Sequence, residues 1–189
     1  MILATNNQGK IREVKSIFED FEIYSLKEKG IFVDVIEDAD SFYGNALKKA
    51  KEIHELTGEA VVADDSGICI DILNDWPGVF THRFMGEEAT DVERNEAILE
   101  KMQAYIGEER NAKVMCSMVY YDGTNIIVGE GILRGKISLE RRGENGFGFD
   151  DIFELADGRT LAELSSEEKN KISARYLALM DLKNKLDNI

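Results

Sequence analysis

A polar segment, residues 5–10, stands where a short apolar stretch gives way to a helical pattern. It consists of Thr5, Asn6, Asn7, Gln8, Gly9 and Lys10. A strand-to-helix junction presents free backbone N–H groups and the positive end of the helix dipole, which together suit an anion, and Lys10 adds a mobile charge. The segment is not a Walker A loop. That motif requires Gly at position 4 and Ser or Thr at position 11, where this chain has Ala4 and Ile11. The alternative is a polar turn with a helix cap and a solvated lysine.

Two adjacent acids, Asp64 and Asp65, follow a buried apolar run and precede Ser66 and Gly67. Consecutive residues at a strand end point to opposite sides, so one acid can face a cleft while the other fixes a turn. We expect Asp65 to face inward, where its carboxylate can hold Mg²⁺ and position or deprotonate an attacking water. The alternative is an ordinary Asp-Ser-Gly turn. The acidic residues 37–40 can supply a second metal ligand or form a solvated surface loop.

Glycines interleaved with aromatic residues mark residues 143–150. Glycine lets the backbone approach a ligand closely, and an aromatic ring can lie flat against a planar group such as a purine. The dinucleotide-binding fingerprint does not match, since the glycines fall at 143, 146 and 148 and no helix follows. Further along, Lys169, Lys171 and Arg175 place cations in a pattern that a charged amphipathic helix gives more often than a binding site.

Other kinds of chemistry find little support in the sequence. His54 and His82 lack metal-ligand spacing and a neighbouring Cys or His, which disfavours zinc. No Ser lies in a Gly-x-Ser-x-Gly elbow, and neither Cys69 nor Cys116 has a paired His in a recognisable signature, which disfavours covalent catalysis. Both cysteines lie in apolar, strand-like runs, so we expect buried thiols in a reducing compartment.

Strands and helices that alternate along the chain must position these segments. We expect strands at 1–4, 23–26, 60–63 and 68–72, the last two separated by a break at 64–67, and a hairpin of 114–121 and 125–137. We expect helices at 11–21, 41–58, 91–102 and 172–186. The first helix carries Ile11, Val14, Ile17, Phe18 and Phe21 at helical spacing, and the second carries Ala46, Leu47, Ala50 and Ile53. This order predicts an α/β fold with a mixed sheet.

Length and charge narrow the class of protein further. The chain has 189 residues and is 43% hydrophobic, which fits a single folded domain over 1–189 without a separable linker. With 23 Lys+Arg against 37 Asp+Glu, its net charge of −14 disfavours a nucleic-acid partner. No apolar run approaches the roughly 20 residues of a membrane-spanning helix. The first residues do not form a targeting signal, so we expect a cytoplasmic protein without a membrane partner.

Five segments in this order resemble the inosine triphosphate pyrophosphatase family, also called Ham1-like or non-canonical purine nucleoside triphosphate pyrophosphatases. They are residues 4–10, Asn45-Ala46 with Lys49, 63–67 followed by 77–79, 146–153 and 168–175. The resemblance covers nearly the whole chain. It implies an elongated two-lobed α/β fold of the Maf/Ham1 type around a long mixed β-sheet, with an active-site cleft between the lobes. It also implies a homodimer and Mg²⁺-dependent cleavage of ITP, dITP and XTP to the monophosphate and pyrophosphate, which cleanses the nucleotide pool.

The resemblance also implies roles for individual residues. Residues 5–10 would cradle the triphosphate, and Lys49 would add a phosphate contact. Asp65 would be metal ligand and general base, and Ser66 would touch the substrate. The second metal ligand would be Glu37, with Asp38 as the alternative. The base and sugar region would be held by Phe147, Gly148, Phe149 and Asp150, and the base would be read from the other side by Lys169 and Arg175.

The chain departs from the family's pattern in four places. Gly44 replaces a Glu, Phe149-Asp150-Asp151 replaces Tyr-Asp-Pro, Ala174 replaces a His, and Thr81-His82-Arg83 replaces Ser-Ala-Arg. The missing histidine normally helps to bind the purine, so base selectivity can be weakened or reassigned, for example to His82. Two alternative functions therefore stay open: a catalytically silent nucleotide-binding or sensing protein, and a pyrophosphatase of broadened base specificity.

Overall fold

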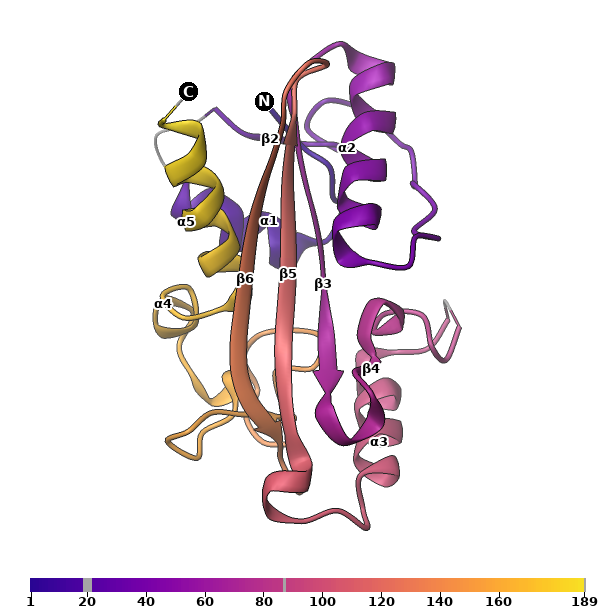
Figure 1. The fold of residues 1–189 in the computed structure, drawn as a ribbon, viewed down its shortest axis with the longest axis vertical. Helices are drawn as coiled ribbons and strands as arrows, with labels where there is room; N and C mark the ends of the chain where they lie inside the picture. The colour runs from indigo at the N-terminus through magenta and orange to yellow at the C-terminus, as the bar shows by residue number, and fades with distance from the viewer. Residues whose placement is uncertain (19–21, 87, 189) are drawn as a thin grey trace. The chain divides into compact units, whose positions relative to one another are not determined.

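The computed structural model describes residues 1–18, 22–86 and 88–188. The chain forms two compact units, each assembled from separate stretches of sequence. Unit 1 comprises Met1–Ser66, Cys116–Gly131 and Ser173–Ile189, and unit 2 comprises Gly67–Met115 and Ile132–Ile172. Three long strands, β3, β5 and β6, contribute residues to both units (Figure 1).

The strands form a mixed sheet, as predicted. They are β1 (Ile2–Leu3), β2 (Tyr24–Ser25), β3 (Val61–Ile70), β4 (Trp76–Pro77), β5 (Asn111–Tyr121), β6 (Ile126–Ile137) and β7 (Phe153–Glu154). Their order is β2-β1-β3-β5-β6-β7, and β4 pairs with β3. Strand β1 is parallel to β2 and β3, whereas β4 is antiparallel to β3 and β7 is antiparallel to β6.

Five α-helices accompany these strands in the described part of the chain. They are α1 (Gln8–Ile17), α2 (Phe42–Thr57), α3 (Asp91–Lys101), α4 (Ser166–Lys169) and α5 (Ala174–Leu186). No helix among the described residues is long and apolar enough to cross a lipid bilayer.

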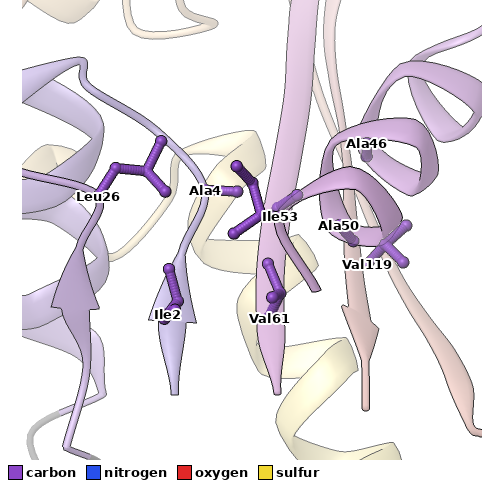
Figure 2. Close-up of a cluster of buried hydrophobic side chains, with 9 residues drawn as sticks. Ile2, Ala4, Leu26, Ala46, Ala50, Ile53, Val61 and Val119 are labelled. Atoms are coloured by element: carbon purple, nitrogen blue, oxygen red, sulfur yellow. The ribbon is translucent and has the colours of Figure 1, made fainter. Parts of the chain in front are cut away.

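Helix α2 builds the core of unit 1. Ser41 Oγ accepts a hydrogen bond from the Gly44 N–H at 3.1 Å and caps the helix, and Gly58 ends it in the left-handed conformation at φ 67°. The buried cluster contains Ile2, Ala4, Leu26, Ala46, Ala50, Ile53, Val61, Ala63 and Val119 (Figure 2). Burial of a side chain such as Ile53 stabilises the fold by about 1.5–3 kcal/mol. The predicted apolar face of this helix is confirmed.

Helices α1 and α5 contact each other, and within unit 1 the strands lie between this pair and α2 (Figure 1). Helix α5 packs directly on β6, because a Cβ at Gly129 or Gly131 would lie within about 2 Å of an α5 carbonyl oxygen. These glycines let the helix approach the sheet backbone. The predicted helix residues Ile11 and Val14 are buried, whereas Phe21 lies outside the described residues.

In unit 2, a buried arginine connects the start of β5 to neighbouring segments. The Arg110 guanidinium donates to the carbonyls of Met102 at 2.6 Å, Tyr105 at 3.1 Å and Ile137 at 2.7 Å, and also to that of Ser138. Since carbonyl oxygens satisfy its N–H groups, the guanidinium is buried without leaving its donors unpaired.

Three sequence predictions about these elements are wrong. The first helix, expected to include Phe18, ends at Ile17, and Phe18 is its C-cap. The expected break at residues 64–67 does not exist: β3 continues from Val61 to Ile70 with every residue buried, and a short 3-10 turn follows at Asp71–Leu73. Its acidic side chains find partners on neighbouring helices, so they do not force the chain out of the sheet. The last helix begins at Ala174 rather than Ile172, because Ser173 Oγ caps it by accepting from the Tyr176 N–H at 3.0 Å.

The cysteines and the hairpin agree with the sequence. Cys69 and Cys116 are buried free thiols. Burial raises the pKa of Cys69 to about 11 and that of Cys116 to about 12. The turn between β5 and β6 is held by Asp122, whose Oδ1 accepts from the Thr124 and Asn125 N–H groups at 2.9 Å and 2.7 Å.

Candidate active site

The strand-to-helix junction forms where the sequence predicts it, between β1 and α1. Asn7 caps the helix: its Oδ1 accepts from the Gly9 N–H at 2.9 Å and the Lys10 N–H at 3.2 Å. The expectation of free amide groups is therefore wrong for these two residues, because the Asn7 side chain already occupies them. Thr5 Oγ1 accepts from the Asn7 N–H at 3.2 Å, and Asn6, Asn7 and Gln8 are exposed to solvent.

Lys10 is buried rather than mobile. Its Nζ lies 3.0 Å from Asp64 Oδ2, and both side chains are almost completely shielded from solvent. The parallel register of β1 on β3, Leu3 opposite Val62, explains the contact. Two residues further on, Asp64 lies beside the point where β1 gives way to α1. Such C-terminal ends of parallel strands are where open α/β sheets commonly bind ligands.

Arg175 reaches the same acid from the start of α5. Its Nε and Nη2 each lie 3.2 Å from Asp64 Oδ2, and Nη2 also donates to Ser66 Oγ at 3.1 Å. Its Nη1 pairs with Glu13, one turn beyond Lys10 on α1. We call Lys10, Glu13, Asp64, Ser66 and Arg175 the Asp64 cluster. Burial opposes ionisation of Asp64, but Lys10, Arg175 and Lys49 outweigh it and lower the pKa of this carboxyl below its ordinary value.

Asp65 has a different set of partners, as expected for the next residue along a strand. Its Oδ2 accepts from Asn45 Nδ2 at 2.8 Å, and its Oδ1 accepts from the Ser66 N–H at 2.9 Å. Lys49, on α2 like Asn45, pairs with Glu37 and donates to the Asp64 carbonyl oxygen at 2.6 Å. We call Glu37, Asn45, Lys49 and Asp65 the Asp65 cluster.

The electrostatics of Asp65 differ from those of its neighbour. Burial first, and then the negative charge of Glu37, raise the pKa of Asp65 to about 6, although Lys49 and Lys10 oppose the shift. Burial disfavours the charged form of Lys49, but Asp64, Glu37 and Asp65 outweigh it and raise the pKa of the lysine. The influence of Lys10 on Asp65 and of Lys49 on Asp64 means that the two clusters form one electrostatic site.

The donor set suits a hard cation held by few protein ligands. The two clusters contain four acids against three cations, and Asp64 Oδ1 is buried without a hydrogen-bond partner among the described residues. No group of three or more His, Cys, Asp or Glu side chains in the described ranges could hold a metal by itself. Mg²⁺ is commonly bound by one or two carboxylates, with waters and substrate phosphates as further ligands.

The glycine-rich loop, in unit 2, gathers a second set of predicted residues. Asp150 Oδ2 accepts from the Phe147 N–H at 2.8 Å and from Lys169 Nζ at 2.6 Å. The same Nζ lies 4.3 Å from the centroid of the Phe147 ring. Gly146, at φ 81°, is required here, because a Cβ would lie 2.1 Å from Asp150 Oδ2. A cavity of about 190 Å³ adjoins the loop, and its lining includes Phe147, Gly148 and Asp150.

The predicted site residues thus divide between the units. Unit 1 contains residues 5–10, Glu37, Lys49, Asp65, Ser66 and Arg175, and unit 2 contains residues 147–150 and Lys169. Sequence reasoning paired Arg175 with Lys169, whereas the contacts of Arg175 described above go to Glu13, Asp64 and Ser66.

Three buried polar residues of the site were missed as site members. Glu13 carries a usable signal, since it stands three residues after Lys10 and so shares its helix face. Asn45 is a polar residue on the apolar face of α2, next to Ala46. Asp64 was expected only to fix a turn.

Comparisons with known proteins identify the family and the fold. A model of the Ham1 family matches residues 1–185. A dITP/XTP pyrophosphatase of Clostridium tetani is 41% identical over 98% of this chain and 95% of its own length, and that of Bacillus subtilis is 40% identical over 98% and 96%. Among solved structures, a HAM1 protein from Coxiella burnetii superposes with a TM-score of 0.89 at 36% identity, covering 100% of this chain and 98% of that one. The Ham1 protein of Staphylococcus aureus gives 0.88 at 34% identity, covering 99% and 97%.

Proposed function

The chain belongs to the Ham1 family, and we propose that it is a nucleoside triphosphate pyrophosphatase acting on non-canonical purine nucleotides such as dITP, ITP and XTP. The relatives named dITP/XTP pyrophosphatases support this substrate class. The structural observation that carries the proposal is the convergence of Lys10 and Lys49 on the adjacent acids Asp64 and Asp65.

The proposed cofactor is Mg²⁺, held by Glu37 and Asp65. The excess of acids over cations and the mutual influence of these two carboxylates support a divalent cation at this place. A bound Mg²⁺ offsets phosphate charge and makes a water a better nucleophile. Asp38 is the alternative to Glu37, although its carboxylate is more exposed and pairs with Lys48 at 2.6 Å.

In the proposed reaction, Asp65 accepts a proton from water. The water oxygen attacks the α-phosphorus, the bond from that phosphorus to the bridging oxygen breaks, and the products are a nucleoside monophosphate and pyrophosphate. The Asn45 amide and the Ser66 N–H hold the Asp65 carboxylate in one orientation. Such fixed placement of a base is a large part of its catalytic effect.

The triphosphate is bound, in this proposal, by residues 5–10 and Lys49. A cation 4 Å from a phosphate is worth about 4 kcal/mol before desolvation at an effective dielectric constant of 20. Exposed acids more than about 8 Å away are largely screened at physiological salt. Lys10, Lys49 and the proposed Mg²⁺ together therefore outweigh the distant acids of a chain whose net charge is −14.

The base and sugar are assigned to residues 147–150 and Lys169, with Arg175 as a further contact. The Phe147 ring offers a planar surface beside a cation, and the Asp150 carboxylate and Lys169 ammonium offer an acceptor and a donor for a base edge. Arg175 touches Ser66, the residue that we assign to the substrate in unit 1.

We propose that the protein is a cytoplasmic homodimer with no nucleic-acid or membrane partner. Two large apolar side chains in unit 1, Phe32 at 85% and Ile36 at 73% exposed, are consistent with burial against a second copy. Light scattering after size-exclusion chromatography tests the dimer.

The decisive experiment is a pyrophosphate-release assay with Mg²⁺ and ITP, XTP, dITP, ATP, GTP and dTTP. The proposal expects rapid release from ITP, dITP and XTP, and its loss in Asp65→Asn with the fold unchanged. Asp71→Asn, an exposed acid just beyond β3, is the matched control. Release of inorganic phosphate instead of pyrophosphate, or no release of pyrophosphate from any purine nucleotide, contradicts the proposal. Nucleotide binding without hydrolysis supports the silent sensor, and equal rates on ATP or GTP support broadened specificity.

A further inference from the structure

Both backbone groups of Gly148 are bound by side chains from the first two turns of α3. The Gly148 N–H donates to Asp91 Oδ2 at 2.9 Å, and the Gly148 carbonyl accepts from Asn95 Nδ2 at 2.7 Å. Asp91 and Asn95 stand four residues apart, on one face of a helix whose start is fixed by a capping box between Thr90 and Glu93. All of these residues belong to unit 2.

The space where a side chain of Gly148 would lie is open. Its φ is +65°, and a Cβ built on it would meet no atom within 4 Å. Glycine adopts several backbone conformations of similar energy, so hydrogen bonds must select one of them. The two bonds from α3 hold the observed conformation together with the turn bond from the Asp150 N–H to the Phe147 carbonyl at 3.4 Å, and so help to set the direction of the chain at Phe147 and Phe149.

The Asn95 side chain donates a second hydrogen bond to the loop. Its Nδ2 also donates to Asp151 Oδ1 at 2.6 Å, and Asp151 Oδ2 accepts from Arg141 Nε at 2.6 Å. The Asp151 side chain thus connects the loop to α3 and to Arg141. Asn95 is 3% exposed, so losing its bonds leaves buried polar groups unpaired.

We propose that Asp91 and Asn95 are positioning residues for the nucleobase, acting through Gly148. By fixing that peptide they place the Phe147 ring and the Asp150 carboxylate, which line the same cavity as Asp91 and Asn95 themselves. This inference rests on the proposed function, because it assigns residues 147–150 to the base. Asp91 and Asn95 touch neither the phosphates nor the reacting atoms in this assignment.

The test compares a substrate that has a base with one that lacks it. In Asn95→Ala, which loses the hydrogen bonds to the Gly148 carbonyl and to Asp151, we expect the KM for ITP to rise about tenfold, which corresponds to about 1.4 kcal/mol, with kcat changed less than about threefold. Inhibition by inorganic tripolyphosphate, which has no base, is expected to stay unchanged. A parallel rise in the tripolyphosphate inhibition constant, or no change in KM, overturns the proposal.

Further variants separate positioning from general damage to α3. Asp91→Ala removes the acceptor for the Gly148 N–H, together with the ion pair between Asp91 and Arg94 at 3.5 Å, and is expected to raise the KM in the same way. Asp91→Asn keeps an oxygen acceptor and is expected to restore the wild-type KM. Glu100→Ala, an exposed change on the same helix, is the matched control.

Amide hydrogen exchange of residues 146–150 in the ligand-free protein distinguishes failure of this inference from failure of the proposed function. Faster exchange in Asn95→Ala and Asp91→Ala than in Glu100→Ala is expected. Unchanged exchange overturns the inference whatever the activity.

If the wild-type chain hydrolyses no nucleoside triphosphate, the proposed function fails, and calorimetric binding of inosine monophosphate replaces KM as the measurement. Equal binding by wild type and Asn95→Ala, or none by either, then overturns the inference.

Discussion

Lys10 Nζ lies 3.0 Å from Asp64 Oδ2, and this ion pair is almost entirely removed from water. The lysine comes from the first turn of α1 and the acid from the middle of β3, so the pair joins the helix to the sheet at the proposed phosphate site. Arg175 adds a second cation to the same carboxylate oxygen. One acid therefore holds two cationic side chains in place before any phosphate binds.

Removal of this central charge should destabilise the protein. In Asp64→Asn, Lys10 and Arg175 stay buried without their shared anion, and loss of one member of a buried pair typically costs about 3–5 kcal/mol. Urea unfolding at pH 7 measures the change, with Asp71→Asn as an exposed control expected to stay within about 0.5 kcal/mol. Equal stability of the two variants would mean that the buried pairs contribute no net free energy.

Removal of the Asp65 charge should have the opposite effect on stability when no metal is bound. Its pKa is raised to about 6 in the folded protein, so the folded state holds a proton that the unfolded state has released. Stability of the wild type should therefore fall as pH rises from about 4 to about 6, with the loss complete above that window. Asp65→Asn has no carboxyl to ionise at this position, so it should be more stable than the wild type by about 3 kcal/mol at pH 7.5.

Urea unfolding in EDTA at pH 7.5 and at pH 4.5 measures this difference, which should shrink at the lower pH. Added Mg²⁺ should stabilise the wild type and leave the variant unchanged, because ligands that bind only the folded state raise its stability. A wild type more stable than Asp65→Asn in EDTA would show that ionised Asp65 is fully compensated without metal.

The sequence predicted the parts of this fold that depend on local spacing. The apolar positions of α2 recur at helical intervals, and Ser41 and Gly58 bound the helix, so its existence and buried face could be inferred from a short window. The hairpin followed in the same way from two strand-like runs around Asp122-Gly123. The motif segments in the family's order predicted the sheet class as well.

Contacts between residues far apart in the sequence could not be predicted. Asp64 and Arg175 are 111 residues apart, and nothing in the spacing of either segment indicates that they meet. Without those partners, an Asp-Asp-Ser-Gly run reads as a turn, and so the continuity of β3 was missed. The Asn7 cap was one of two alternatives that the sequence left open, because an asparagine at a helix start can leave the amides to a ligand or occupy them itself.

Gly131 should be required for the position of Arg175. In Gly131→Ala, the new Cβ would lie 2.0 Å from the Ala174 carbonyl oxygen and 2.6 Å from the Ala178 nitrogen, so α5 must move away from β6. Overpacking of this kind costs about 1–3 kcal/mol. We expect a lower melting temperature and reduced kcat/KM, since the first turn of α5 carries Arg175. Ile132→Ala, at the next and exposed position of β6, is the control. Full activity in Gly131→Ala would separate the site from the packing of α5.

The choice between Glu37 and Asp38 as second metal ligand can be made by the Mg²⁺ requirement. Glu37 is the acid that raises the pKa of Asp65, so it lies close enough to share a cation with it, whereas the Asp38 carboxylate is bound to Lys48. We expect Glu37→Gln to need at least about tenfold more Mg²⁺ for half-maximal activity, which corresponds to about 1.4 kcal/mol of binding free energy. The kcat at saturating Mg²⁺ should recover most of its wild-type value, because Asp65 and its partners Asn45 and Ser66 are untouched. Asp38→Asn, one residue away, is the matched control and should leave the requirement unchanged; the reverse pattern would assign the metal to Asp38.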